Sequence, residues 1–352
     1  MENKITLKKK EGYTSTKPSD KDTIVQADVD LDNLPTNLCP NKPISQNSLP
    51  EKILNGKDTY GQRKHNGHCL IFVKGKKTEK VYSRRMEDLT PYIGHLSLIQ
   101  ETMSRIPKGS FVLTEMTWMD NALKKEVPRI VATLVRTQTP EDVSGKFKAF
   151  SKLGHFHIIP FDALFVGHAF KGNLDYMDRY YLLNSLNLTC PIVLPLWKDA
   201  IDMAKKANWE GFVLRVPGEK SHISYTMDGK AHRAGSWKYK FTKEGDFIID
   251  EVLYGKSGKH AKFYSKFHVY QIQPVEDGRV AIPIDRGYVG PGTLAHEELE
   301  QLTKDINSKK RKLPFVVEVE YQSIHDETGK LEFGQIQRIR EDKTPEECIA
   351  DE

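Results

Sequence analysis

A lysine beside a tight turn is the first feature of this chain that could do covalent chemistry. Lys64-His65-Asn66-Gly67 stands just ahead of an apolar run, Cys69-Leu70-Ile71-Phe72-Val73. An Asn-Gly pair is typical of a turn, and the apolar run is typical of a buried strand. A lysine amine placed there is a candidate nucleophile. The tetrapeptide alone fits a solvated surface lysine equally well.

Two glutamates lie within strand-like, apolar surroundings further along the chain. Glu115 is part of Val112-Leu113-Thr114-Glu115-Met116, and Glu210 begins Glu210-Gly211-Phe212-Val213-Leu214-Arg215. Burying a carboxylate costs free energy unless it pairs with a cation or binds a metal ion. Each glutamate alone fits a structural ion pair or an outward-facing strand position as well as it fits a site.

A pair of lysines follows on another strand-like segment, Ser236-Trp237-Lys238-Tyr239-Lys240-Phe241. Because strand side chains alternate between two faces, Lys238 and Lys240 share one face and the three aromatic residues share the other. The lysines could lie on a half-exposed strand, or they could point together at a phosphate.

The order of these residues resembles the ATP-dependent polynucleotide ligases, within the lysine-nucleotidyltransferase superfamily that also contains the mRNA-capping enzymes. Seven motifs spread over about residues 60–348 carry the resemblance. In chain order they are Lys64 to Cys69, Ser83 to Thr90, Glu115, Phe161-Asp162-Ala163-Leu164, Glu210 to Arg215, Lys238-Tyr239-Lys240 and Arg340-Glu341-Asp342-Lys343. Each motif is weak singly, but seven in the family's order are strong evidence. The last motif favours DNA ligases over capping enzymes.

The resemblance implies five catalytic residues. Lys64 would attack the α-phosphate of ATP, release pyrophosphate and hold AMP as a phosphoramidate, which requires a neutral amine. Lys238 and Lys240 would neutralise the charge that develops on the α-phosphate. Arg340 and Lys343 would orient pyrophosphate during this first step, coming from a mobile C-terminal domain.

The resemblance also implies a nucleotide and metal site, formed together with the three lysines of the first domain. Gln62 would read the adenine edge, Phe161 would stack on the base, and Arg84 would contact the ribose or the acceptor phosphate. Glu115 would bind the ribose or the metal, and Glu210 would ligate the metal. Mg²⁺ is the ion expected, because carboxylate and phosphate oxygens suit a hard cation.

The chain departs from the family pattern beside the lysine. Asn66 stands where the family has aspartate, Cys69 where it has arginine, and Leu113-Thr114 where it has Asp-Gly. We expect a divergent but active enzyme, with the contact missing at Cys69 supplied by a nearby cation, Arg63, Arg84 or His68.

The elements that must position these residues follow from the hydrophobic pattern. In the first part of the chain, strands are predicted over 68–73, 81–84, 111–118, 156–166, 211–216 and 236–241, and helices over 89–106, 175–186 and 198–207. Further strands are predicted over 247–253, 263–275, 279–284, 315–321 and 335–340, with one helix over 294–308.

These elements predict an α+β protein with two domains. A polar, partly disordered arm over 1–48 precedes a nucleotidyltransferase (adenylation) domain of antiparallel sheets and flanking helices over 49–243. A C-terminal β-barrel of the oligonucleotide-binding (OB) type follows over 244–348, because several short strands with one helix between them fit that fold, and 349–352 form a tail.

Composition and charge indicate which classes of partner to expect. The chain has 352 residues, a net charge of +5 and local basic runs such as Lys309-Lys310-Arg311-Lys312, which suit a polyanion. It has no membrane span or signal-peptide pattern, and its four cysteines are far apart, so an intracellular protein is expected. The expected partner is nicked duplex DNA, clamped by a monomer in replication, repair or recombination.

Two other readings stay open. One is an RNA ligase of the same superfamily, for which the altered first motif leaves room. The other is a non-catalytic nucleic-acid-binding relative, against which the retained Lys64, Lys238 and Lys240 count. An NAD-dependent ligase is disfavoured, since the chain lacks a four-cysteine zinc cluster.

Overall fold

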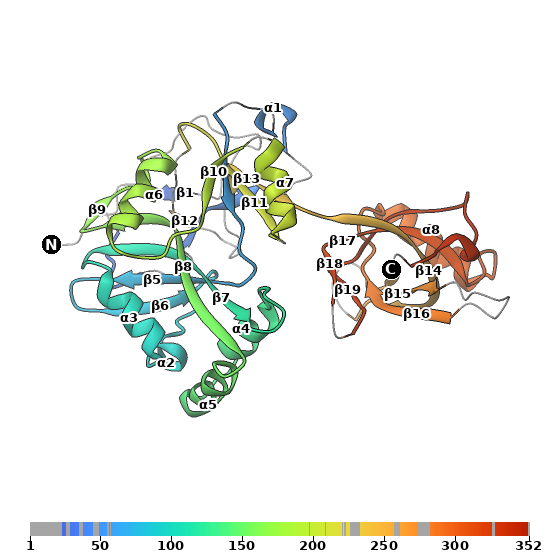
Figure 1. Ribbon diagram of the computed structural model, residues 1–352, viewed down its shortest axis with the longest axis horizontal. Helices are drawn as coiled ribbons and strands as arrows, with labels where there is room; N and C mark the ends of the chain where they lie inside the picture. Colours follow the sequence, from blue (N-terminus) through green and yellow to red (C-terminus); the bar gives the residue numbers. More distant parts are fainter. Residues whose placement is uncertain are drawn as a thin grey trace. The chain divides into compact units, whose positions relative to one another are not determined.

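The chain forms two compact units, Met1–Lys240 and Phe241–Glu352 (Figure 1). The computed structural model describes residues 23–25, 29–34, 38–44, 49–54, 56, 58–196, 198–207, 209–219, 221, 223–225, 233–256, 261–273, 282–325 and 328–350. Both units mix helices and strands, so the α+β class expected from the sequence is confirmed. No helix in these ranges is long and apolar enough to cross a bilayer.

The first unit contains two five-stranded sheets, each assembled from distant parts of the chain. One has the order β6-β5-β7-β8-β9, and its strands are β5 (His68–Lys74), β6 (Glu79–Ser83), β7 (Ser110–Asp120), β8 (Gly154–Val166) and β9 (Ala169–Phe170). The other has the order β10-β4-β11-β13-β3, and its strands are β3 (Lys42–Ile44), β4 (Tyr60–Arg63), β10 (Val193–Pro195), β11 (Gly211–Arg215) and β13 (Arg233–Lys240). A three-stranded sheet adds β1 (Thr23–Val25), β12 (Ile223–Tyr225) and β2 (Leu38–Pro40).

The sheet around β5 is buried on both faces, which explains its uninterrupted apolar sequence. Leu70 and Phe72 point into one hydrophobic core, and Cys69, Ile71 and Val73 point into another. The first core is closed by helices α2 to α5, which lie along β5 to β8 in Figure 1.

The helices of the first unit are short. They are α1 (Glu51–Leu54), α2 (Thr90–Ile93), α3 (Ser97–Arg105), α4 (Pro128–Val135), α5 (Pro140–Phe150), α6 (Tyr176–Ser185) and α7 (Lys198–Lys206). The single helix predicted over 89–106 is wrong, because Leu96 takes an extended conformation between α2 and α3. Ile93, Leu96 and Ile99 all enter the same core, so the apolar spacing continues across the break. The sequence reading also missed α4 and α5.

Part of the N-terminal arm packs onto the first unit. Leu31 is buried against the second core, and Asp32 accepts hydrogen bonds from the backbone N–H groups of Lys77 and Thr78, both at 2.9 Å. These bonds hold the pKa of Asp32 at about 2. Residues 1–22 and 45–48 lie outside the described residues. The described arm is thus tied to the turn between β5 and β6.

The second unit is built on a five-stranded antiparallel sheet of order β16-β15-β14-β17-β20 around one core. Its elements are β14 (Lys243–Tyr254), β15 (Tyr264–Gln273), β16 (Ile282–Val289), α8 (His296–Asn307), β17 (Phe315–Tyr321), β18 (Ser323–Ile324), β19 (Leu331–Glu332), β20 (Gln335–Ile339) and the 3-10 turn η3 (Pro345–Glu347). A parallel bridge between Gly290 and Gln335 joins the end of β16 to β20.

The predicted strand over 279–284 has the wrong bounds, since β16 continues to Val289. Within the part of β16 that was not predicted, Arg286 is buried and donates to Gln271 Oε1 at 3.0 Å. Residues 279–281 lie outside the described residues.

Candidate active site

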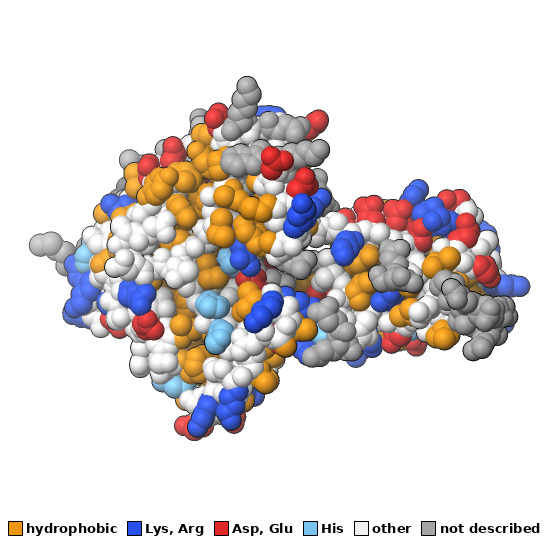
Figure 2. All heavy atoms as spheres, viewed as in Figure 1, with side chains coloured by type: hydrophobic (Ala, Val, Ile, Leu, Met, Phe, Trp, Pro, Cys, Tyr) orange, Lys and Arg blue, Asp and Glu red, His pale blue; other side chains and the backbone are white. Residues whose placement is uncertain are grey.

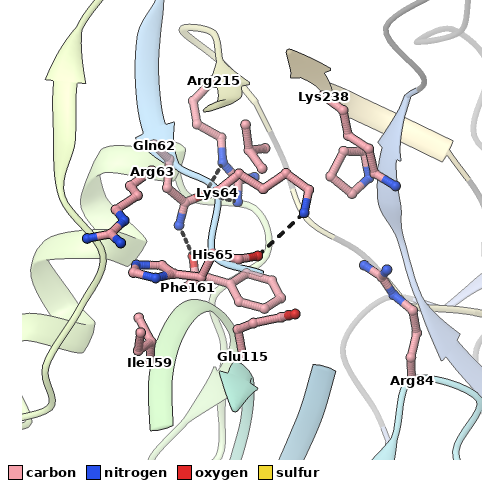
Figure 3. Close-up of a pocket in the computed structure, with 12 residues that line it drawn as sticks. Gln62, Arg63, Lys64, His65, Arg84, Glu115, Ile159, Phe161, Arg215 and Lys238 are labelled. Carbon is pink, nitrogen blue, oxygen red and sulfur yellow. Dashed lines mark hydrogen bonds between the residues drawn. The ribbon is translucent and has the colours of Figure 1, made fainter. Parts of the chain in front are cut away.

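A pocket opens between the two five-stranded sheets of the first unit (Figure 3). Twelve residues line it: Pro43, Gln62, Arg63, Lys64, His65, Arg84, Glu115, Ile159, Phe161, Val213, Arg215 and Lys238. Six of the ten residues predicted to form the site are among them. The pocket therefore gathers residues as far apart in the sequence as Pro43 and Lys238.

Strand register explains how each sheet forms one wall. On one sheet, Gln62 of β4 pairs with Val213 of β11, which pairs with Lys238 of β13. Residues directly opposite in an antiparallel ladder share a face, so these three side chains form a row. On the other sheet, Glu115 of β7 pairs with Ile159 of β8, and Phe161 lies two residues further along the same face.

The segment 64–67 between β4 and β5 carries the candidate nucleophile without belonging to a strand. The backbone N–H of Lys64 donates to the carbonyl of Gly211 at 2.9 Å. Gly67 lies against β7 so closely that a Cβ atom would stand 2.1 Å from the Met116 carbonyl oxygen. Lys64 is therefore held at the point where the two sheets approach each other.

Glu210 joins two of the predicted lysines. Its side chain is only 3% exposed, and its two oxygens form ion pairs with Lys64 Nζ and, at 2.8 Å, with Lys240 Nζ. The next residue, Gly211, has a φ of +146°, and a Cβ there would lie 2.1 Å from the Tyr239 carbonyl. The Glu-Gly pair is thus required both for the carboxylate and for close packing against β13.

Glu115 differs from Glu210, because no described residue forms a hydrogen bond or ion pair with its carboxylate. Burial raises the pKa of Glu115 to about 7, although the nearby charges of Lys64 and Arg84 work in the opposite direction. Figure 3 shows the carboxylate pointing into the pocket below Lys64. A half-buried carboxylate without a partner is suited to receive a cation or a hydroxyl group.

Lys238 lies across the pocket from Glu115. Burial, together with the neighbouring cations Arg84, Lys64 and Lys240, lowers the pKa of Lys238 to about 8. Arg84 itself follows β6 in a tight turn held by Ser83, whose Oγ accepts from the N–H groups of Arg85 and Glu87 at 3.2 Å. These cations give one side of the pocket a strong preference for an anion.

Gln62 is expected to read the adenine edge, but most of the hydrogen-bonding capacity of its amide is already used within the protein. Gln62 Oε1 accepts from Arg215 Nε and Nη2 at 2.9 and 2.7 Å, and Nε2 donates to the Phe161 carbonyl at 3.3 Å. Arg215 is paired in turn with Glu219 at 2.5 Å. Only the second N–H of Gln62 is left for a ligand.

Arg340 and Lys343 belong to the second unit. Both pair with one carboxylate there, Asp246, with distances of 2.7 Å to Arg340 Nη1 and 2.5 Å to Lys343 Nζ. Asp342 also pairs with Arg340 at 2.7 Å. The structure brings together the other eight predicted residues in the first unit: six line the pocket, Glu210 forms an ion pair with Lys64, and Lys240 forms an ion pair with Glu210.

Sequence reasoning considered Arg63 as a substitute cation and singled out none of the other five lining residues for the site. Val213 and Arg215 lie within the motif that begins at Glu210, and Ile159 is two residues before Phe161, so strand alternation could have found them. Pro43 lies in the N-terminal arm, and no sequence pattern links it to the site. His65, next to Lys64, also escaped notice.

The described residues contain no cluster of three or more His, Cys, Asp or Glu side chains arranged to hold a metal ion. Glu115 and Glu210 nevertheless fit Mg²⁺, which is commonly held by one or two carboxylates together with substrate phosphates and water. The unpartnered carboxylate of Glu115 is the observation that supports this fit.

No family model and no curated protein matches the sequence. Solved structures do match. Pmar-Lig_PreS3 is 14% identical with a TM-score of 0.57, over 85% of this chain and 67% of that one. A Lig E DNA ligase structure is 13% identical with a TM-score of 0.52, over 81% and 93%. The ligase domain of LigD from M. tuberculosis is 17% identical with a TM-score of 0.43, over 90% and 99%.

The first two of these likenesses cover most of this chain with TM-scores above 0.5. The chain has a DNA ligase fold. At identities this low the likeness concerns the fold alone, so the activity of this ligase-fold protein depends on the residues of its pocket.

Proposed function

We propose that this protein is an ATP-dependent DNA ligase that seals nicks in duplex DNA. The observation that carries the proposal is Lys64 at the junction of two sheets, in one pocket with Glu115, Arg84 and Lys238. Covalent nucleotidyl transfer needs these components: an amine nucleophile, cations for the phosphate and a carboxylate for a metal or sugar hydroxyl.

In the first step, the neutral amine of Lys64 attacks the α-phosphorus of ATP. A P–N bond forms, the bond from the α-phosphorus to the bridging oxygen breaks, pyrophosphate leaves and the amine loses a proton. Lys238 and Arg84 stabilise the negative charge on the α-phosphate. Lys64 must first leave Glu210, whose carboxylate then remains paired with Lys240.

Mg²⁺, when bound, would neutralise phosphate charge and help pyrophosphate to leave. Glu115 and Glu210 are the residues that would hold it. In later steps AMP passes from Lys64 to the 5′-phosphate at a nick, and the 3′-hydroxyl displaces AMP to form the phosphodiester bond.

We propose further that the second unit is an OB barrel, which supports the same function. Its strand order, with a helix between β16 and β17 and a bridge from Gly290 to Gln335 closing the sheet, is that expected of a five-stranded OB barrel. We propose that it supplies Arg340 and Lys343 to the first step, as a mobile domain of a monomer that clamps the duplex.

The proposal is tested by incubating the full chain with Mg²⁺ and α-labelled ATP or GTP. We expect label on the protein from ATP, none in Lys64→Ala and normal labelling in Lys80→Ala. Lys80 is a matched lysine outside the pocket, paired with Asp88 at 3.1 Å. No label from either nucleotide would overturn the proposal.

The labelled protein is then offered nicked DNA or nicked RNA. We expect DNA to discharge the label and yield a sealed strand. Discharge by RNA alone would favour an RNA ligase, for which the substitutions at Asn66 and Cys69 leave room.

A further inference from the structure

One buried carboxylate holds the backbone and side chains around Lys64. Glu126 follows the turn after β7, and its side chain is 9% exposed. Its Oε2 accepts from the backbone N–H of Asn66 at 2.7 Å. Its Oε1 lies 2.5 Å from His65 Nδ1 and 3.4 Å from Arg63 Nη2.

These contacts lie on both sides of the candidate nucleophile. Arg63 precedes Lys64, and His65 and Asn66 follow it. The segment 64–67 lies outside the strands, so its conformation depends on contacts such as these. With the bond from Lys64 N–H to Gly211, Glu126 fixes the backbone that aims the lysine.

The contacts of Glu126 are those expected of an ionised carboxylate. Burial works to raise its pKa, but the hydrogen bond and charge of His65, the Asn66 N–H and Arg63 together lower it below the usual range. Charge-assisted hydrogen bonds to a buried carboxylate are stronger than neutral ones, and removing the charge leaves several donors unsatisfied.

The segment that Glu126 holds lacks a negative charge that is present in the ligase family this sequence resembles. Asn66 stands where that family carries aspartate, and Asn66 is the residue whose N–H Glu126 binds. We propose that Glu126 is a positioning residue that supplies, from outside the lysine motif, the negative charge missing at Asn66. This inference rests on the proposed function, since Lys64 is the residue positioned.

Three variants test the inference in the full chain: Glu126→Gln, Asn66→Asp and the double variant. We expect Glu126→Gln to lower the rate of Lys64 adenylylation at least tenfold while the KM for ATP changes little. Asn66→Asp in that background should restore the rate to within about threefold of the parent, because the carboxylate returns beside the same loop. Asn66→Asp alone should slow the reaction, since two carboxylates then crowd one site. Glu79→Gln, an exposed glutamate paired with Lys74, serves as the matched control.

A second readout does not depend on activity. Hydrogen exchange of the peptide containing Asn66 should be faster in Glu126→Gln and unchanged in Glu79→Gln. Unchanged adenylylation and unchanged exchange in Glu126→Gln would overturn the inference. A loss that Asn66→Asp fails to restore would also overturn it, because Glu126 would then matter only for local folding. If the parent protein takes no label at all, the proposed function fails, while the exchange result still decides whether Glu126 holds the loop.

Discussion

The carboxylate of Glu115 is half-buried, faces the pocket and has no partner among the described residues. Its pKa of about 7 lies above the value near 4.5 that a carboxyl has in the unfolded chain. Ionising it in the folded state therefore costs free energy, and this cost grows as the pH rises from about 4.5 to about 7 and is fully present above that. Below about pH 4.5 the group is protonated in both states and the cost vanishes. Such a cost is expected where a residue is retained for a ligand.

We predict that Glu115→Gln stabilises the protein at pH 8 and has little effect on stability at pH 4.5. The gain at pH 8 should approach about 3 kcal/mol, from a pKa difference of roughly 2.5. Lys64 adenylylation should fall at least tenfold in the same variant. Chemical unfolding at the two pH values measures the first effect. Equal stability changes at both pH values would contradict the role given to burial.

The pKa of Lys238 is shifted in the opposite direction, down to about 8, so its amine is partly neutral at pH 8. A triphosphate beside it should favour the charged form. We predict that binding of a non-hydrolysable ATP analogue at pH 8 takes up about half a proton through this side chain. Calorimetric titrations in buffers of different ionisation enthalpy report the uptake.

Lys238→Arg is the control for this measurement, because arginine keeps the charge at every pH used. The uptake should fall in this variant while binding persists. The same uptake in both proteins would assign the proton to another group.

At the scale of elements, the sequence predicted the strands that carry the site better than the connections between them. Period two placed Lys238 on one face of its strand with Lys240, and Figure 3 shows Lys238 pointing into the pocket. The row of Gln62, Val213 and Lys238 could not be predicted, because the register between β4, β11 and β13 depends on tertiary packing.

The prediction of a single helix over 89–106 was wrong for a similar reason. The apolar spacing of Ile93, Leu96 and Ile99 reports burial against one core, and it does not report whether the backbone between them stays helical. The role of Glu126 could likewise not be predicted, since nothing in the sequence connects it to the segment 60 positions earlier that it holds.

The N-terminal arm is the element whose part in the site is easiest to test. Strand β3 pairs with β13, and Pro43 of β3 lines the pocket. We predict that removing residues 1–44 abolishes adenylylation, whereas removing residues 1–22 does not. Pro43→Ala, which keeps the strand, should raise the KM for ATP by a few fold. Full activity without residues 1–44 would exclude the arm from the site.

At the scale of the whole molecule, the predicted functional residues are divided between two units. The first unit holds the pocket, and the second holds Arg340 and Lys343 on Asp246. If the second unit serves only the first step, the steps of ligation can be separated by mutation.

We predict that Lys343→Ala slows Lys64 adenylylation at least tenfold and slows sealing of a pre-adenylylated nick less than threefold. Lys330→Ala is the control, because Lys330 is an exposed lysine of the same unit that pairs with Asp285. Equal losses in the two steps would contradict the assignment of the second unit to lysine adenylylation.

Gly67 and Gly211 offer a means of disabling the pocket without changing the net charge of the protein. Each backbone lies so close to a carbonyl oxygen that a single methyl group would stand 2.1 Å from it. Gly67→Ala or Gly211→Ala would displace Lys64 or Glu210 while leaving every charge of the protein in place. Because the attraction between protein and DNA is largely electrostatic and strongly dependent on salt, such alanine variants would give an inactive protein whose long-range attraction for DNA is preserved. For the ligase proposed above, they are therefore suited to trapping a complex with the nick that the active enzyme would seal.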